Sequence, residues 1–84
     1  MNSIIWSSYA RRQLRQINRQ FRSQITDAVD TLVDMPNVLN VRALSNHRYG
    51  YRLRLGHFRV LFDWHKMVKI VEIQQVKKRD EHTY

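Results

Sequence analysis

Three arginines alternate with apolar residues in the second half of the chain. Arg52 and Arg54 are two residues apart, and Arg59 follows after Gly56-His57, a pair typical of a tight turn. In an extended strand, side chains two residues apart point to the same face, so these guanidinium groups would share one surface of two neighbouring strands. Guanidinium groups bind phosphates through paired hydrogen bonds. The spacing therefore predicts a site for a phosphate-bearing ligand.

The sequence around these arginines lacks compensating acids. No Asp or Glu stands between Asp34 and Asp63, and a further basic run occupies residues 77–79. Because unneutralised cations repel one another, such a cluster favours an anionic partner over ordinary solvated surface. A second basic series lies on the expected helices and is interpreted as solvated surface, with contact to the ribosome or to nucleic acid as the alternative: Arg11, Arg12, Arg15, Arg19 and Arg22.

The composition limits the function further. The 84 residues carry 15 Lys+Arg against 7 Asp+Glu, a formal net charge of +8, which fits nucleic acid, an anionic membrane or an acidic protein as partner. The absence of cysteine excludes disulfide scaffolds, thiol nucleophiles and zinc ribbons. The four histidines lack metal-ligand spacing, and the apolar runs are too short to cross a membrane. Without a recognisable secretory signal, we expect a cytoplasmic protein with no metal or other cofactor.

Length and periodicity predict one α+β domain over residues 1–84. A first strand is expected at 3–6, and Ser7 or Ser8 can cap the helix that follows. Apolar residues then recur at spacings of three and four until Met35-Pro36 ends the helical pattern. We expect a turn near Asn18, which would give a helical hairpin, because one helix of about 28 residues hardly fits so small a domain.

After Pro36 the apolar period changes from 3.6 to 2. This predicts a three- or four-stranded antiparallel meander with strands at 51–55, 58–64 and 68–76, and a short strand or extended segment within 38–44. The helices would cover one face of the sheet and leave the arginine face open. Three large aromatic residues are assigned to the core: Trp6, Tyr9 and Trp64.

Three segments together resemble the RelE toxins of bacterial type II toxin–antitoxin pairs, in the RelE/ParE superfamily. They are Tyr51-Arg52-Leu53-Arg54-Leu55, Phe58-Arg59-Val60-Leu61-Phe62 and Val76-Lys77-Lys78-Arg79-Asp80-Glu81-His82-Thr83-Tyr84. The resemblance implies a RelE-like microbial ribonuclease fold and an endoribonuclease that cleaves mRNA in the A site of the 30S ribosomal subunit, which inhibits translation. It implies metal-free attack by the RNA's own 2′-hydroxyl, giving a 2′,3′-cyclic phosphate. It also implies a cognate antitoxin, and such pairs usually bind their own operator DNA.

The resemblance also assigns roles to residues. It implies five catalytic residues: Arg52 and Arg54 flanking the scissile phosphate, Arg59 holding it, Arg79 supporting the leaving oxygen, and Tyr84 orienting a base. It implies three further RNA-binding residues: Lys77, Lys78 and His82. The best-studied members have lysines at the first two positions, one of them thought to be the general base, whereas arginine does not release its proton near neutral pH. Either catalysis is therefore mostly electrostatic, or another group takes the proton, with four candidates for the base: His57, His82, Lys78 and Tyr84.

Two other functions stay open. ParE proteins share the fold and poison DNA gyrase without cutting RNA, and they tend to lack the arginine and tyrosine site. A non-enzymatic module that binds RNA or DNA would explain the net charge alone.

Overall fold

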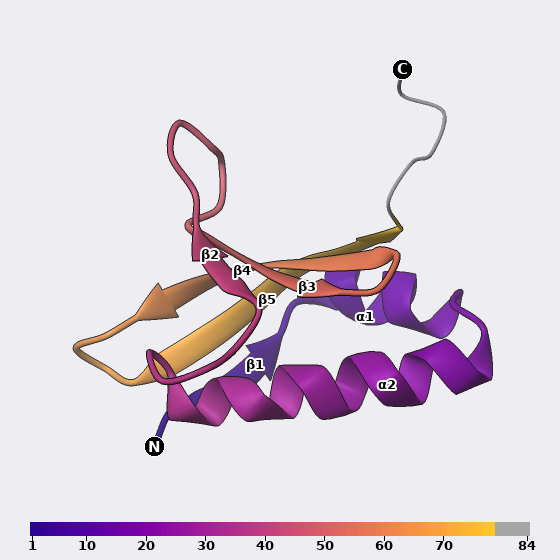
Figure 1. The fold of residues 1–84 in the computed structure, drawn as a ribbon, viewed down its shortest axis with the longest axis horizontal. Helices are drawn as coiled ribbons and strands as arrows, with labels where there is room; N and C mark the ends of the chain where they lie inside the picture. Colours follow the sequence, from indigo (N-terminus) through magenta and orange to yellow (C-terminus); the bar gives the residue numbers. More distant parts are fainter. Residues whose placement is uncertain (79–84) are drawn as a thin grey trace.

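The chain forms a five-stranded sheet with two helices in a computed structural model that describes residues 1–78 (Figure 1). The elements in order are β1 (Ser3–Trp6), α1 (Ser8–Arg15), α2 (Arg19–Asp30), a 3₁₀ helix (Thr31–Asp34), β2 (Val41–Ala43), β3 (Tyr51–Leu55), β4 (Phe58–His65) and β5 (Ile70–Lys78). The strand order is β1-β5-β4-β3-β2, with β1 parallel to β5 and every other pair antiparallel. The predicted α+β class and element order are confirmed.

The predicted break between the helices lies at Asn18. Its side-chain oxygen accepts a hydrogen bond from the backbone N–H of Gln20 at 3.2 Å and so caps the start of α2. Arg22 closes the turn from the other side, because its Nη2 donates to the backbone oxygen of Ile17 at 3.2 Å. The interpretation of Arg22 as solvated surface is therefore wrong: the side chain is half-buried against the end of α1.

The core lies between α2 and one face of the sheet. Ile25 and Val29 of α2 are fully buried at a helical spacing of four, and Leu32 of the 3₁₀ helix continues the stripe. They belong to one cluster with Phe62 of β4 and Ile73 of β5. Because every second residue of β4 points into this core, the residues between them point to the other face.

The last strand starts later than the sequence indicates. The periodicity predicts a start at Val68, but this side chain is 64% exposed in the turn after β4, and β5 begins at Ile70. Lys69 has a φ of 56°, a left-handed conformation that ends the turn just before the strand. The strand also carries one extra residue: Gln75 pairs with Leu61, while the next β4 residue pairs with Ile73. This bulge turns two successive side chains toward the face opposite the core.

Side chains from the region of α1 form hydrogen bonds with backbone groups at the edge of β5, beyond the point where β1 ends. The Gln13 Oε1 accepts from the backbone N–H of Val76 at 2.7 Å, and the Ser7 Oγ donates to the backbone oxygen of Gln74 at 3.3 Å. The same Ser7 oxygen accepts from the N–H of Ala10 and caps α1, as the sequence predicts. The start of α1 is therefore held beside the bulge of β5.

Candidate functional site

The register of the sheet gathers basic side chains on the face opposite the core, here called the open face. Arg54 of β3 pairs with Arg59 of β4, and Arg59 pairs in turn with Lys77 of β5. One step along, Arg42 of β2 pairs with Arg52 of β3. Paired residues on one face have Cβ atoms about 4.5–5.5 Å apart, so these five residues form one cationic cluster.

Two guanidinium groups of this cluster are partly withdrawn from water without a partner. Arg52 and Arg59 are half-buried, and the Nε of each is buried with no hydrogen-bond acceptor. Burial, followed by the charges of Arg59, Arg42 and Arg54, holds the pKa of Arg52 below its usual value. Within residues 1–78 no carboxylate forms an ion pair with any of these arginines. Unused donors held among like charges are suited to an anion.

An apolar residue beneath the cluster explains the burial of the arginines. Leu61 lies on the open face, since it pairs with Arg52 on one side and Gln75 on the other, yet it is only 5% exposed. The long aliphatic stems of neighbouring arginines can cover such a side chain while their charged ends stay near the surface. The guanidinium groups are thereby held against the sheet.

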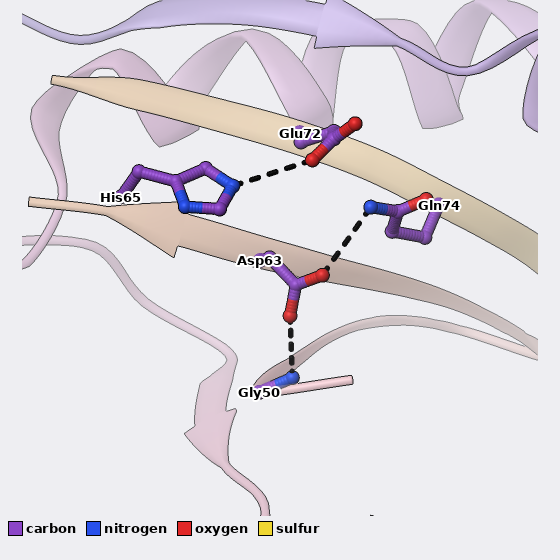
Figure 2. Close-up of polar contacts among 5 residues, drawn as sticks. All are labelled: Gly50, Asp63, His65, Glu72 and Gln74. Carbon is purple, nitrogen blue, oxygen red and sulfur yellow. Dashed lines mark hydrogen bonds and ion pairs between the residues drawn. The ribbon is translucent and has the colours of Figure 1, made fainter. Parts of the chain in front are cut away.

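The acids of the open face lie further along the sheet and are already engaged (Figure 2). One oxygen of Asp63 accepts from the backbone N–H of Gly50 at 2.8 Å, and the other accepts from the Nε2 of Gln74 at 3.3 Å. Glu72 lies 3.3 Å from the Nε2 of His65 and forms an ion pair with this imidazole when it is protonated. The open face is therefore cationic at one end and acidic at the other.

Two of the four candidate bases lie away from the cluster. His57 and Lys78 line a cavity of about 390 Å³ together with Phe21 and Phe58, beside the turn between the helices. Lys78 pairs with Phe58, whose side chain is in the core, so Lys78 points to the helix side of the sheet. The other two candidates, His82 and Tyr84, lie outside the described residues, as does Arg79.

A second cavity adjoins the cationic cluster, and no pattern in the sequence predicts it. Its wall includes Tyr9, which is 49% exposed and lines a cavity of about 540 Å³. His47 and Tyr49 of the loop between β2 and β3 form another wall, with Gln74 and Gln75 from the bulge. The core assignment of Tyr9 is wrong because α1 crosses the edge of β5 and turns its first residues toward the open face.

The sequence matches the family model described as the ParE toxin of type II toxin–antitoxin systems over residues 4–82. The chain belongs to this toxin family. It is therefore a toxin of the RelE/ParE superfamily, as the resemblance to RelE proteins implied. No curated protein sequence matches it significantly.

Solved RelE structures share the fold of the toxin at low sequence identity. The isolated E. coli RelE toxin has a TM-score of 0.82 at 14% identity, covering 99% of this chain and 89% of that one. RelE in the archaeal RelE–RelB complex from Pyrococcus horikoshii OT3 has a TM-score of 0.79 at 20% identity, covering 95% and 97%. RelE in the intact E. coli RelBE complex has a TM-score of 0.78 at 15% identity, covering 96% and 100%.

The structure brings together part of the predicted site of the toxin. Arg52, Arg54 and Arg59 share the open face, and Lys77 joins them. Arg42 also joins them, although sequence reasoning missed it, because its pairing with β3 crosses a loop with no regular pattern. Residues 1–78 contain no group of three potential metal ligands. They also contain no helix long and apolar enough to span a membrane.

Proposed function

We propose that this toxin is a metal-independent endoribonuclease that cleaves mRNA in the A site of the ribosome and so inhibits translation. The cationic cluster carries the proposal: an uncovered sheet face presents several guanidinium groups, two of them with a buried and unpaired Nε. Such donors are costly to leave unpaired in a folded protein. A phosphodiester bound by the outer N–H groups of these guanidinium groups would neutralise their charge and offset that cost.

The reaction follows from the charge that develops at phosphorus. The 2′-oxygen of the RNA attacks the adjacent phosphate and loses its proton to a base. The bond from phosphorus to the 5′-oxygen breaks, and that oxygen takes up a proton, which leaves a 2′,3′-cyclic phosphate and a 5′-hydroxyl. The non-bridging oxygens gain negative charge in between, so cations already in place lower the barrier. Arg52, Arg54 and Arg59 are proposed to serve this purpose, with Lys77 positioning the backbone of the RNA.

The proton transfers are proposed for the end of the chain. Because His57 and Lys78 line the cavity beside the helical turn, His82 and Tyr84 become the favoured base candidates. Histidine has an ordinary pKa near 6.5, which suits a general base at neutral pH. Arg79 is proposed to support the leaving oxygen, and Tyr84 to orient an unpaired base by stacking.

A cognate antitoxin is the proposed protein partner. Several similar RelE proteins were crystallised in complexes with RelB antitoxins. An acidic antitoxin segment would complement the net charge of +8. It would dock on the helical hairpin or along an edge of the sheet, and the pair would bind its operator DNA in the cytoplasm.

The proposal is tested by incubating the toxin with translating ribosomes and mapping the new 5′ ends of the mRNA. We expect cleavage within the codon of the A site, and a loss of about 10²–10³-fold in rate for Arg59→Ala. Arg11→Ala is the matched control, because Arg11 is an exposed arginine of α1 that lies outside the cationic cluster. Intact message at stoichiometric toxin would contradict the proposal.

Inhibition of DNA gyrase is the second candidate, because the matching family model is that of the ParE toxins. A supercoiling assay separates the two functions. A gyrase inhibitor stops supercoiling and leaves mRNA whole, whereas a ribonuclease leaves supercoiling unaffected. A module that only binds nucleic acid would neither stop supercoiling nor cleave mRNA.

A further inference from the structure

We propose that the cavity beside the cationic cluster binds one unpaired base of the RNA, with preference for a base that carries an amino group. This inference rests on the proposed function for the identity of the ligand as RNA. The cavity, here called the base pocket, is lined by Tyr9, His47, Tyr49, Gln74 and Gln75, together with Ser7 and Arg48. Its volume of about 540 Å³ falls within the range of roughly 300–1,000 Å³ typical of small-ligand sites.

The base pocket lies beside the cationic cluster on the same face of the sheet. Gln75 pairs with Leu61, which pairs with Arg52, so the floor of the pocket and the arginine cluster share one row of the sheet. Lys77 is two residues further along the same strand, a distance of about 6.8 Å. A base whose own phosphate lies on the arginines would therefore lie beside the pocket.

The aromatic walls are held in place, with Tyr9 and His47 exposed and Tyr49 half-buried. The rings of His47 and Tyr49 lie 6.1 Å apart at 47°, and the backbone N–H of Tyr49 donates to the Nδ1 of His47 at 3.1 Å. The guanidinium carbon of Arg48 lies 5.3 Å from the Tyr49 ring centre. The loop carrying them rises from the end of β2 on the side of the sheet away from α2 (Figure 1). Together with Tyr9, these rings offer stacking surface to a base.

The loop is anchored to the sheet at both ends. The backbone N–H of Leu44 donates to the oxygen of Gly50 at 2.8 Å, and the N–H of Gly50 donates to Asp63. A closed loop of this kind loses little further conformational freedom when a ligand binds. The aromatic wall is therefore already formed before RNA arrives.

The amide floor supplies the preference. An ionised carboxylate only accepts hydrogen bonds, so the NH₂ group of Gln74 must face Asp63, and its Oε1 points away as an acceptor (Figure 2). Adenine, cytosine and guanine offer an exocyclic amino group to such an acceptor, whereas uracil does not. Because Asp63 also accepts a hydrogen bond from the backbone N–H of Gly50, one carboxylate fixes both the end of the β2–β3 loop and the orientation of the Gln74 side-chain amide.

The test measures binding without cleavage. Fluorescent 2′-O-methyl trinucleotides of adenine, cytosine or uracil are titrated with the toxin, because methylation blocks the attacking hydroxyl. We expect adenine and cytosine to bind about 2- to 12-fold more tightly than uracil, the effect of one hydrogen bond. Tyr49→Ala should weaken all three by about 5- to 150-fold, and Tyr49→Phe should restore them. Gln74→Leu should abolish the preference.

The control is Arg54→Ala, which should weaken the three trinucleotides equally and keep their order. The base pocket is excluded if Tyr49→Ala binds within twofold of wild type, or if Gln74→Leu keeps the wild-type preference. In the wild-type toxin, NMR signals of the Gln74 and Gln75 side-chain amides should shift on adding the adenine trinucleotide, and unmoved signals would also overturn the proposal. If the toxin cleaves mRNA but Gln74→Leu keeps the wild-type base preference, the proposed function stands and the base pocket is refuted. If the toxin binds the trinucleotides with the expected preference but does not cleave mRNA, the base pocket stands and the proposed function is refuted.

Discussion

Arg52 should lower the stability of the folded toxin, because its half-buried charge is surrounded by like charges. Replacing it with methionine keeps an unbranched apolar stem over Leu61 and removes the guanidinium group. We therefore expect Arg52→Met to be more stable than wild type and to lose the proposed RNA cleavage. A gain in stability together with a loss of cleavage would show that the charge serves the reaction and not the fold.

The size of the effect follows from the structure. The Nε of Arg52 is buried with no acceptor, and an unsatisfied buried donor costs about 1–3 kcal/mol. Burial and the charges of Arg59, Arg42 and Arg54 lower the pKa of Arg52, so folding brings this cation into an unfavourable environment. Allowing for screening by water and salt, we expect a net gain of about 1 kcal/mol, which raises the melting temperature of a domain of this size by about 4–8 °C.

The lowered pKa of Arg52 also determines how its effect on the stability of the toxin depends on pH. A cation whose pKa is lowered by folding destabilises the protein wherever both folded and unfolded states hold the proton, and the destabilisation is relieved only in strongly alkaline solution, as the pH rises through the lowered pKa of the folded state. Near neutral pH both states are protonated. The difference in melting temperature between Arg52→Met and wild type should therefore be constant between about pH 6 and 9.

The assay is thermal unfolding followed by circular dichroism at low and high salt. The gain for Arg52→Met should shrink as salt rises, because part of it is relief of repulsion. Arg11→Met is the matched control: Arg11 is exposed on α1, so its replacement should change the melting temperature little. A melting temperature for Arg52→Met below that of wild type would refute the reasoning, since it would mean that the charge stabilises the fold.

Three further perturbations test the arrangement. Asp63→Ala removes the acceptor for the Gly50 N–H, so the loop between β2 and β3 should loosen. Hydrogen exchange at Gly50 should become faster, and the free energy of unfolding in urea should fall by about 1–3 kcal/mol. Unchanged exchange would show that the carboxylate does not hold the loop. Asn18→Ala removes the cap of α2 and should cost about 0.5–2 kcal/mol, whereas the exposed mid-helix change Ser23→Ala should not destabilise; equal effects would argue against the cap. Arg54→Ala leaves one phosphate of single-stranded RNA without its cation, so the plot of log affinity against log salt concentration should become less steep, by about 0.7 in slope. A plot parallel to that of wild type would show that Arg54 does not bind a phosphate.

The sequence predicts the cationic face where local periodicity determines it. Arg52 and Arg54 alternate with core residues on one strand, and Gly56 ends that strand, so their shared face with Arg59 follows from a two-residue period and a tight turn. Asn18 could likewise be recognised as a helix cap from its residue type and position.

Local periodicity does not predict the parts of the site that depend on contacts between residues far apart in the sequence. Arg42 joins the cluster only because a three-residue strand pairs with β3 across a long loop. Tyr9 lies on the open face because α1 crosses β5, where Gln13 takes the place of a neighbouring strand. The extra residue at Gln74 also changes which side chains face the site. The sequence shows the shift in phase, because apolar residues alternate at Val71 and Ile73 and resume at Val76, but only the pairing with β4 identifies it as a bulge.

The two faces of the sheet distribute stability and function unequally. Burial against α2 stabilises the core face through residues such as Phe62 and Ile73, at about 25 cal/mol for each Å² of apolar surface removed from water. On the open face, Leu61 is buried beside Arg52 with no helix layer over it, and the guanidinium groups repel one another. Any ligand that supplies negative charge there removes this repulsion and stabilises the fold in proportion to its affinity. An RNA phosphate, the ligand proposed for this face, would satisfy that need.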